Sequence, residues 1–287
     1  MRVLVIRGPF PALTGPDHRS AAAARGMGYD GGRDGVEMLI AQLLAGCTEP
    51  AYADPDRNRN LLGDDSAPVD TDTDTGDSAV TWADVTGTLT LVDFQTREPF
   101  EDVELSLADD EWTSAKDGTV SPIVPGGTTS LLSAGHVSLA PMEISLTTDD
   151  LTGWTVPIPL AFQTPLETVF STNGVTWDTA KGVLMVSVLE DTGTEKVALD
   201  RTTVTISSTY DTVIASTGNV YIPSNEVGED GNGLVMFVNV PAGAATIELD
   251  TPGSYDCVLF PSTATTDLTA TVTAGKATVV TVTCTRG

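Results

Sequence analysis

The stretch Val85-Thr86-Gly87-Thr88-Leu89-Thr90-Leu91 decides the fold class of this chain, because apolar and polar positions alternate along it. The same alternation recurs in Val103-Glu104-Leu105-Ser106-Leu107 and in Val280-Thr281-Val282-Thr283-Cys284. A period of two places one row of side chains in a core and the other in water, as in a sheet with one solvated face. Threonine suits the solvated row because it is β-branched and polar. We therefore expect strands from Trp82 onward, with threonine hydroxyls facing solvent.

Turn-forming sequences separate the alternating segments. Glycine supplies the positive φ that tight turns require, and proline fixes the direction in which the chain enters a turn. No stretch after Trp82 shows helical periodicity. Short strands with frequent turns predict an all-β chain built of antiparallel β-sandwiches. The turn sequences are Lys116-Asp117-Gly118, Pro125-Gly126-Gly127, Thr172-Asn173-Gly174, Asp230-Gly231-Asn232-Gly233, Pro241-Ala242-Gly243 and Pro252-Gly253.

The net charge excludes one large class of partner. The 287 residues carry 40 acidic and 14 basic side chains, which gives −26. A nucleic-acid binder needs a basic face to meet phosphate groups, so we expect no nucleic-acid partner. Anionic membrane surfaces are disfavoured for the same reason. No apolar run approaches the roughly 20 residues that a membrane-spanning helix needs.

Catalytic and metal-binding chemistry lacks its usual residues. His18 and His136 are the only histidines, and no nucleophile-elbow, zinc-protease, phosphate-loop or dinucleotide motif occurs. We therefore expect no enzyme and no catalytic residues, and we interpret His136 as an exposed structural histidine. The alternative is a secreted hydrolase of unrecognised type, which predicts that His136→Ala or a specific carboxylate change abolishes its activity.

The sequence Leu44-Ala45-Gly46-Cys47 has the form of a lipobox, and the short apolar stretch 38–43 precedes it. Through these residues the chain resembles bacterial lipoproteins, although acidic residues stand where a basic region is usual. The resemblance implies that residues 1–47 are a signal or leader segment and that Cys47 carries a lipid. It also implies outer-membrane retention, because Thr48 rather than aspartate follows the cysteine. The alternative is a short amphipathic helix over 36–45 with an incidental cysteine.

Residues 48–81 have the composition of an acidic tether. They contain Asp54-Pro55-Asp56 and Asp70-Thr71-Asp72-Thr73-Asp74-Thr75-Gly76, with almost no apolar side chain that could be buried. Like charges repel along such a segment, so it is predicted to be disordered. Residues 70–76 approach a calcium-loop pattern but lack its glutamate, and weak association with cations is the expectation there.

Two modules are predicted after the tether, over residues 82–180 and 181–287. Each opens with a strand and continues through an Asp/Asn-Gly turn to a Val-Pro segment with glycine, as in Glu229–Gly243. Through these residues the second module resembles the carboxypeptidase regulatory-like (transthyretin-like) β-sandwich, and the first does so more faintly. The resemblance implies a scaffold, spacer or binding module without catalytic zinc. The insertion Tyr210–Glu226 departs from the family pattern, and an immunoglobulin-like sandwich is the alternative.

Cys257 and Cys284 are the remaining cysteines. Each falls on the apolar row of an alternating segment, a disposition that suits a core disulfide. Closing a loop of nearly 30 residues stabilises the fold by roughly 3–4 kcal/mol in the chain-entropy model. A disulfide indicates an oxidising, extracytoplasmic compartment. The alternative is a pair of buried free thiols.

These features predict a surface-anchored lipoprotein, held at the outer membrane or cell surface, with structural or adhesive sandwich modules. Its expected partners are the lipid membrane and a cell-surface protein or glycan. Contact candidates are the loops 109–112, 149–154 and 210–226, although Trp112 and Trp154 also suit packing at a sandwich edge. The alternative function is a calcium- or carbohydrate-binding module. Its oxygen ligands would be Asp109, Asp110, Glu229, Asp230 and Asn232, with Ca²⁺ as the one cofactor considered.

Overall fold

The computed structural model describes residues 82–149, 152–218, 220–229, 231–264 and 267–287. The predicted leader of residues 1–47, its lipidated Cys47 and the acidic tether of residues 48–81 lie outside the described part of the chain. Those expectations therefore stay predictions.

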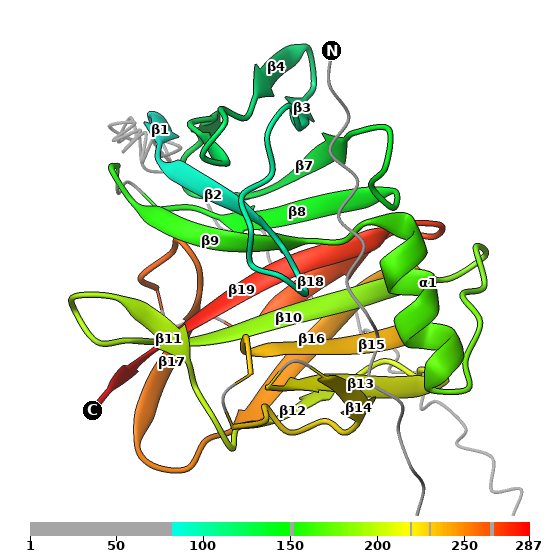
Figure 1. Ribbon diagram of the computed structural model, residues 1–287. Helices are drawn as coiled ribbons and strands as arrows, with labels where there is room; N and C mark the ends of the chain where they lie inside the picture. The colour runs from blue at the N-terminus through cyan, green and yellow to red at the C-terminus, as the bar shows by residue number, and fades with distance from the viewer. Residues whose placement is uncertain (1–81, 150–151, 219, 230, 265–266) are drawn as a thin grey trace, which may run out of the picture. The chain divides into compact units, whose positions relative to one another are not determined.

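The first half of the described chain forms nine strands and a helix (Figure 1). The strands are β1 (Asp84–Thr86), β2 (Thr88–Asp93), β3 (Glu104–Leu107), β4 (Asp110–Thr113), β5 (Thr119–Val120), β6 (Ile123–Pro125), β7 (Thr129–Gly135), β8 (Met142–Thr147) and β9 (Thr155–Leu160), and the helix is α1 (Gln163–Thr172).

The second half consists of strands alone. They are β10 (Gly182–Asp191), β11 (Lys196–Ala198), β12 (Thr203–Ile206), β13 (Thr212–Thr217), β14 (Val220–Pro223), β15 (Leu234–Val240), β16 (Gly243–Asp250), β17 (Tyr255–Leu259), β18 (Thr269–Val272) and β19 (Ala277–Arg286).

One long sheet runs through both halves in the order β14-β13-β15-β10-β19-β8-β7-β3-β4, with β11 beside β10 and β17 beside β19. Most pairs of described strands are antiparallel, as expected. The pairs β10–β19, β19–β8 and β2–β9 are parallel, which the alternation of side chains did not indicate. Strand β8 belongs to the first predicted module and β19 to the second, and the two strands are hydrogen-bonded neighbours. The long sheet is therefore continuous across the boundary predicted between residues 180 and 181. The division into modules stays a prediction.

Two three-stranded sheets complete two sandwiches, and β1 pairs with β6 in a separate two-stranded sheet. The sheet β5-β2-β9 belongs to a first core, in which Leu89 and Ile158 pack with Leu132 and Ile144 of the long sheet. The sheet β12-β16-β18 belongs to a second core, which includes Leu184 of the long sheet. The fold is all-β and sandwich-like, as predicted. No helix within the described residues is long and apolar enough to cross a membrane.

The threonines of β19 correct the expectation that this residue marks the solvated face. Thr278 is fully buried, Thr281 is 2 % exposed and Thr283 is 7 % exposed. The reason is the position of β19 between β10 and β8, where protein covers both faces of the sheet. Its apolar residues divide accordingly, with Val279 in the first core and Val280 in the second.

Replacing Thr278 by valine is expected to raise the free energy of unfolding by about 1 kcal/mol. The Thr278 hydroxyl is buried without a hydrogen-bond partner among the described residues, and burying such a group costs about 1–3 kcal/mol. Chemical denaturation measures the change. Thr285→Val is the control on the same strand, because Thr285 is exposed and should change stability by less than about 0.5 kcal/mol. A loss of stability in Thr278→Val would show that the hydroxyl has a partner.

Helix α1 is the element that the sequence analysis missed, and the expectation of no helix after Trp82 is wrong. Its buried side chains, Leu166, Val169 and Phe170, follow helical spacing for only one turn. No side chain caps its N-terminus, so the usual start signal is missing. The sequence Thr172-Asn173-Gly174, interpreted as a turn between strands, ends this helix, and the Asn173 side chain donates to the Val169 carbonyl over 2.8 Å.

Candidate functional site

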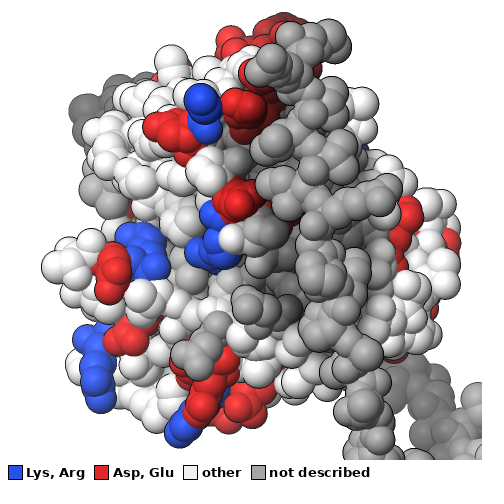
Figure 2. Space-filling model, in the orientation of Figure 1, with Lys and Arg blue, Asp and Glu red and all other residues white. Residues whose placement is uncertain are grey.

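Basic side chains are few on the described surface, and most are paired with carboxylates. On the face drawn in Figure 2 they lie scattered among acidic side chains. The ion pairs are Lys181–Asp211 at 3.2 Å, Lys196–Asp191 at 2.9 Å, Lys276–Glu143 at 2.5 Å and Arg201–Glu229. Within the described residues, Arg97, Lys116 and Arg286 form no ion pair.

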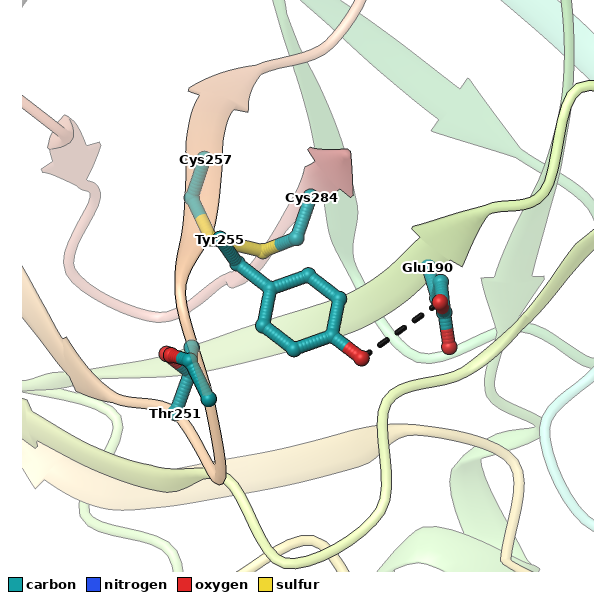
Figure 3. The surroundings of a disulfide bond; sticks show 6 residues. Glu190, Thr251, Tyr255, Cys257 and Cys284 are labelled. Atoms are coloured by element: carbon teal, nitrogen blue, oxygen red, sulfur yellow. Dashed lines mark hydrogen bonds between the residues drawn. A yellow bond between two sulfur atoms is a disulfide. The ribbon is translucent and has the colours of Figure 1, made fainter. Parts of the chain in front are cut away.

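Cys257 of β17 and Cys284 of β19 form a disulfide, as predicted (Figure 3). The two residues are direct partners in an antiparallel pair, with their Cα atoms 4.0 Å apart. Cys284 is fully buried in the second core, and Cys257 packs against that core from a half-buried position. The alternative of two buried free thiols is therefore wrong.

The disulfide fixes β17 to the last strand of the described chain. Beside it, the Tyr255 hydroxyl donates to Oε1 of Glu190 over 3.4 Å, which links β17 to the end of β10 (Figure 3). The bridge encloses the segment that contains β18, a strand of the second small sheet. The bridge therefore joins two neighbouring strands of the long sheet, and the loop that it closes carries one strand of the second small sheet.

The structure does not bring the calcium candidates together. Asp109 and Asp110 lie at the β3–β4 hairpin, at one end of the long sheet, whereas Glu229 and Asn232 follow β14 at the other end. Glu229 pairs with Arg201, and the Asn232 amide donates to the Phe94 carbonyl. Asp230 lies outside the described residues. No group of three or more histidine, cysteine or acidic side chains in the described ranges is arranged to hold a metal ion. Calcium binding stays a prediction.

His136 lies in the loop between β7 and β8 and is half-buried. Its Nδ1 accepts a hydrogen bond from the Ser138 backbone N–H over 3.3 Å. No described hydrogen bond joins the imidazole to a serine hydroxyl or to a carboxylate, so the arrangement of a nucleophile, base and orienting acid is not formed among the described residues.

The two tryptophans of the predicted contact loops pack against the first core. The Trp154 ring lies directly over Gly87, where an added Cβ would come within 1.9 Å of the indole. It also meets the Phe260 ring edge-on, with centroids 5.9 Å apart. These contacts agree with packing at a sandwich edge, the alternative that the sequence analysis left open for Trp112 and Trp154.

The insertion 210–226 forms the β13–β14 hairpin at the edge of the long sheet. Val220 and Ile222 of β14 are 57 % and 42 % exposed, whereas Tyr221 between them points inward and donates to the Phe94 carbonyl over 2.7 Å. Tyr210 packs on Phe237, with ring centroids 5.0 Å apart. The insertion therefore presents an apolar row on one face and fixes the turn after β2 with the other.

Asp149, from the predicted contact loop 149–154, makes internal contacts. Its carboxylate accepts hydrogen bonds from the Ser262 hydroxyl over 2.7 Å and from the backbone and hydroxyl of Thr263 over 2.5 and 2.9 Å. Desolvation acts to raise the pKa of Asp149, but these hydrogen bonds outweigh it and the pKa is lowered from its ordinary value. The side chain joins the end of β8 to the segment after β17.

The lowered pKa of Asp149 predicts a pH dependence of stability. Its contribution should be complete above the unfolded-state pKa of about 3.9 and should be lost as the pH falls through the lower folded-state value. We expect Asp149→Asn to be less stable than the wild type at pH 6, with a difference that shrinks between pH 4 and pH 2. Urea unfolding at several pH values measures the difference, and a gap that stays constant over this range would contradict the prediction.

A cavity that the sequence analysis missed lies between the two halves of the described chain. It has a volume of about 350 Å³, and its lining includes Gln95, Arg97, Lys196, Tyr221 and Asn232. We call it the junction cavity. These residues come from separate turns and strands, so no single stretch of sequence carries a signal for it.

The comparisons with known proteins identify no family. No family model matches the chain, and no curated protein matches it. Similar solved structures include the minor pilin GBS52 of Streptococcus agalactiae, with 10 % identity, a TM-score of 0.27 and coverage of 71 % of this chain and 96 % of that one. A streptococcal ancillary pilin has 13 % identity and a TM-score of 0.24, covering 71 % and 69 % of the two chains. The shaft pilin SpaA of Lactobacillus rhamnosus GG has 12 % identity and a TM-score of 0.23, covering 70 % and 98 %. At these scores the likeness carries no argument about function.

Proposed function

We propose that this chain is an extracytoplasmic lipoprotein, anchored through Cys47, whose β-sandwiches form a non-catalytic scaffold that presents a binding surface. The observation that carries the proposal is the disulfide between Cys257 and Cys284. Structural disulfides persist in oxidising compartments outside the cytoplasm. The bridge also uses two of the three cysteines, which leaves Cys47 of Leu44-Ala45-Gly46-Cys47 as the one free for a lipid.

The order of the parts supports the anchor. The proposed acylated cysteine would be followed by the acidic segment 48–81, whose 34 residues would span about 30–35 Å as a flexible coil. This length would carry the sandwiches clear of the lipid headgroups. The strong negative charge of the chain would keep the sandwiches from adsorbing to an anionic membrane surface. We include in the proposal retention at the outer membrane and a carboxypeptidase regulatory-like type for the second sandwich.

Metabolic labelling with an alkyne fatty acid tests the anchor in bacterial cells. The full chain should take up the label and stay in the membrane fraction, whereas Cys47→Ser should lose the label and leave that fraction. Cys257→Ser is the matched control, because it removes a cysteine outside the leader and should keep the label. Equal labelling of the wild type and Cys47→Ser would overturn the proposed anchor.

Protease treatment of intact cells tests the compartment separately. A surface-exposed chain should be cleaved within the acidic segment without cell lysis. A chain that is cleaved only after lysis of the outer membrane would still be extracytoplasmic but would contradict surface display.

A further inference from the structure

Arg97, which forms no ion pair with any described residue, lines the junction cavity of this acidic protein. It lies in the turn after β2 with a φ of 62°, and its backbone N–H donates to the Asp93 carbonyl over 2.9 Å. The one described hydrogen bond of its guanidinium goes to the backbone carbonyl of Asn232 over 3.4 Å. Desolvation lowers the pKa of Arg97 from its ordinary value, although the residue as a whole is exposed to solvent. The cavity therefore offers a positive charge that forms no ion pair within the described part of the chain.

The wall beside Arg97 is preformed. The Tyr221 hydroxyl donates to the Phe94 carbonyl over 2.7 Å and accepts from the Asn232 amide over 3.0 Å. Burial raises the pKa of Tyr221 well above its ordinary value, so its hydroxyl stays neutral at physiological pH. The Phe94 and Tyr221 rings pack with centroids 5.2 Å apart, which holds the wall in place. The carboxylate of Asp93 acts electrostatically on Tyr221, and its Oδ1 is already engaged by the backbone N–H groups of Gln95 and Thr96.

A second cavity, of about 510 Å³, adjoins the first through Lys196, which lines both. We call it the Trp154 cavity, and its lining includes the indole of Trp154, the hydroxyl-bearing Thr155 and Thr194, and the carboxylate of Glu195. An aromatic ring beside hydroxyl and carboxylate groups suits a sugar, whose apolar ring face stacks while its hydroxyls form hydrogen bonds. Both volumes fall within the range of about 300–1,000 Å³ that is typical of ligand sites.

We propose that these two cavities form one groove for an acidic glycan, in which Arg97 binds the carboxylate of a uronic acid residue and the glycan continues past Lys196 into the Trp154 cavity. The inference deepens the proposed function, because it names the class of ligand that the scaffold would present or capture. It rests on that proposal only in requiring that the groove face the outside of the cell.

The charges favour a glycan of low charge density over a phosphate-rich or peptide ligand. Lys196 is already neutralised by Asp191, so Arg97 is the single uncompensated cation in the described lining. A planar guanidinium fits one carboxylate through two parallel hydrogen bonds. A polyphosphate would need several cations, and an acidic peptide would place further carboxylates near Asp191 and Glu195.

Isothermal titration calorimetry on the full chain, purified from membranes in detergent, tests the inference. The probes are an acidic tetramer of three galactose residues and one terminal galacturonic acid residue, a neutral galactose tetramer, the galacturonic acid monomer and acetate. We expect the acidic tetramer to bind at least tenfold more tightly than the neutral tetramer, and more tightly than the monomer or acetate. Arg97→Gln should lower the affinity for the acidic tetramer at least tenfold and should leave the affinity for the neutral tetramer unchanged.

Lys116→Gln is the matched control, because Lys116 is an exposed cation in the turn between β4 and β5, lies outside both cavities and forms no ion pair with a described residue. It should bind the acidic tetramer as the wild type does. Equal binding by Arg97→Gln and the wild type, or equal affinity for the acidic and neutral tetramers, would overturn the inference. Acetate binding as tightly as the acidic tetramer would indicate a simple anion site and would overturn the proposal of a glycan ligand. An absence of glycan binding would not bear on the proposed lipid at Cys47, so the two proposals can fail separately.

Discussion

Replacing Cys257 and Cys284 together by alanine is expected to lower the free energy of unfolding by about 3.5 kcal/mol. The two cysteines are 27 residues apart in sequence, and releasing a loop of this length returns about that much entropy to the unfolded chain at 25 °C. Loss of the buried Cys284 sulfur from the second core acts in the same direction. Guanidinium denaturation of the wild type and of the double variant measures the difference.

Reductant provides the internal control for this prediction. Dithiothreitol should destabilise the wild type by a similar amount and should leave the double variant unchanged. A double variant as stable as the oxidised wild type would contradict the role assigned to the disulfide. A wild type that does not respond to reductant after unfolding would show that the bridge is not formed in the purified protein.

Replacing Asn239 by alanine is expected to cost about 3 kcal/mol, because this side chain holds three groups at once. Asn239 is 2 % exposed, and its Oδ1 accepts the Asp178 backbone N–H over 2.8 Å. Its Nδ2 donates to the Thr176 carbonyl and to Oδ2 of Asp211, both over 2.9 Å. The network ties the segment between α1 and β10 to the end of β15.

Asn239 also has a φ of 62°, a conformation that asparagine tolerates better than alanine. Asn239→Gly removes the hydrogen bonds without this backbone cost, so it should be less destabilised than Asn239→Ala by roughly 1 kcal/mol. Lys181→Met removes only the exposed ion pair with Asp211 and should cost less than about 1 kcal/mol. Thermal or chemical unfolding compares the three variants. Stability of Asn239→Ala within about 0.5 kcal/mol of the wild type would contradict the assignment.

The alternation of side chains predicted individual strands but not their neighbours. Leu89 and Leu105 are buried as the pattern indicates, and both belong to the first core. Alternation reports that one face of a strand is apolar, and it does not report whether protein also covers the other face. This is why buried Thr281 was placed in solvent, and why the parallel pairing of β19 with β8 and β10 was not foreseen.

The disulfide could be predicted because both cysteines fall on the inward row of their own strands, and local pattern alone determines that row. The junction cavity could not, because Arg97, Lys196 and Tyr221 meet only through tertiary packing. Helix α1 was not predicted for a third reason, because its apolar positions cover only one turn and no side chain caps its start. Local rules therefore predict local elements here, and the candidate ligand site depends on contacts between elements far apart in sequence.

The central claim is that a lipid-anchored chain carries disulfide-stabilised sandwiches outside the cytoplasm. Intact mass spectrometry of the protein purified from native membranes, with and without reductant, tests it most directly. We predict a chain that begins at Cys47, carries the added mass of a diacyl or triacyl lipid, and gains the mass of two hydrogen atoms on reduction. A chain without lipid that still contains residues before Cys47, and whose mass does not change on reduction, would contradict the account.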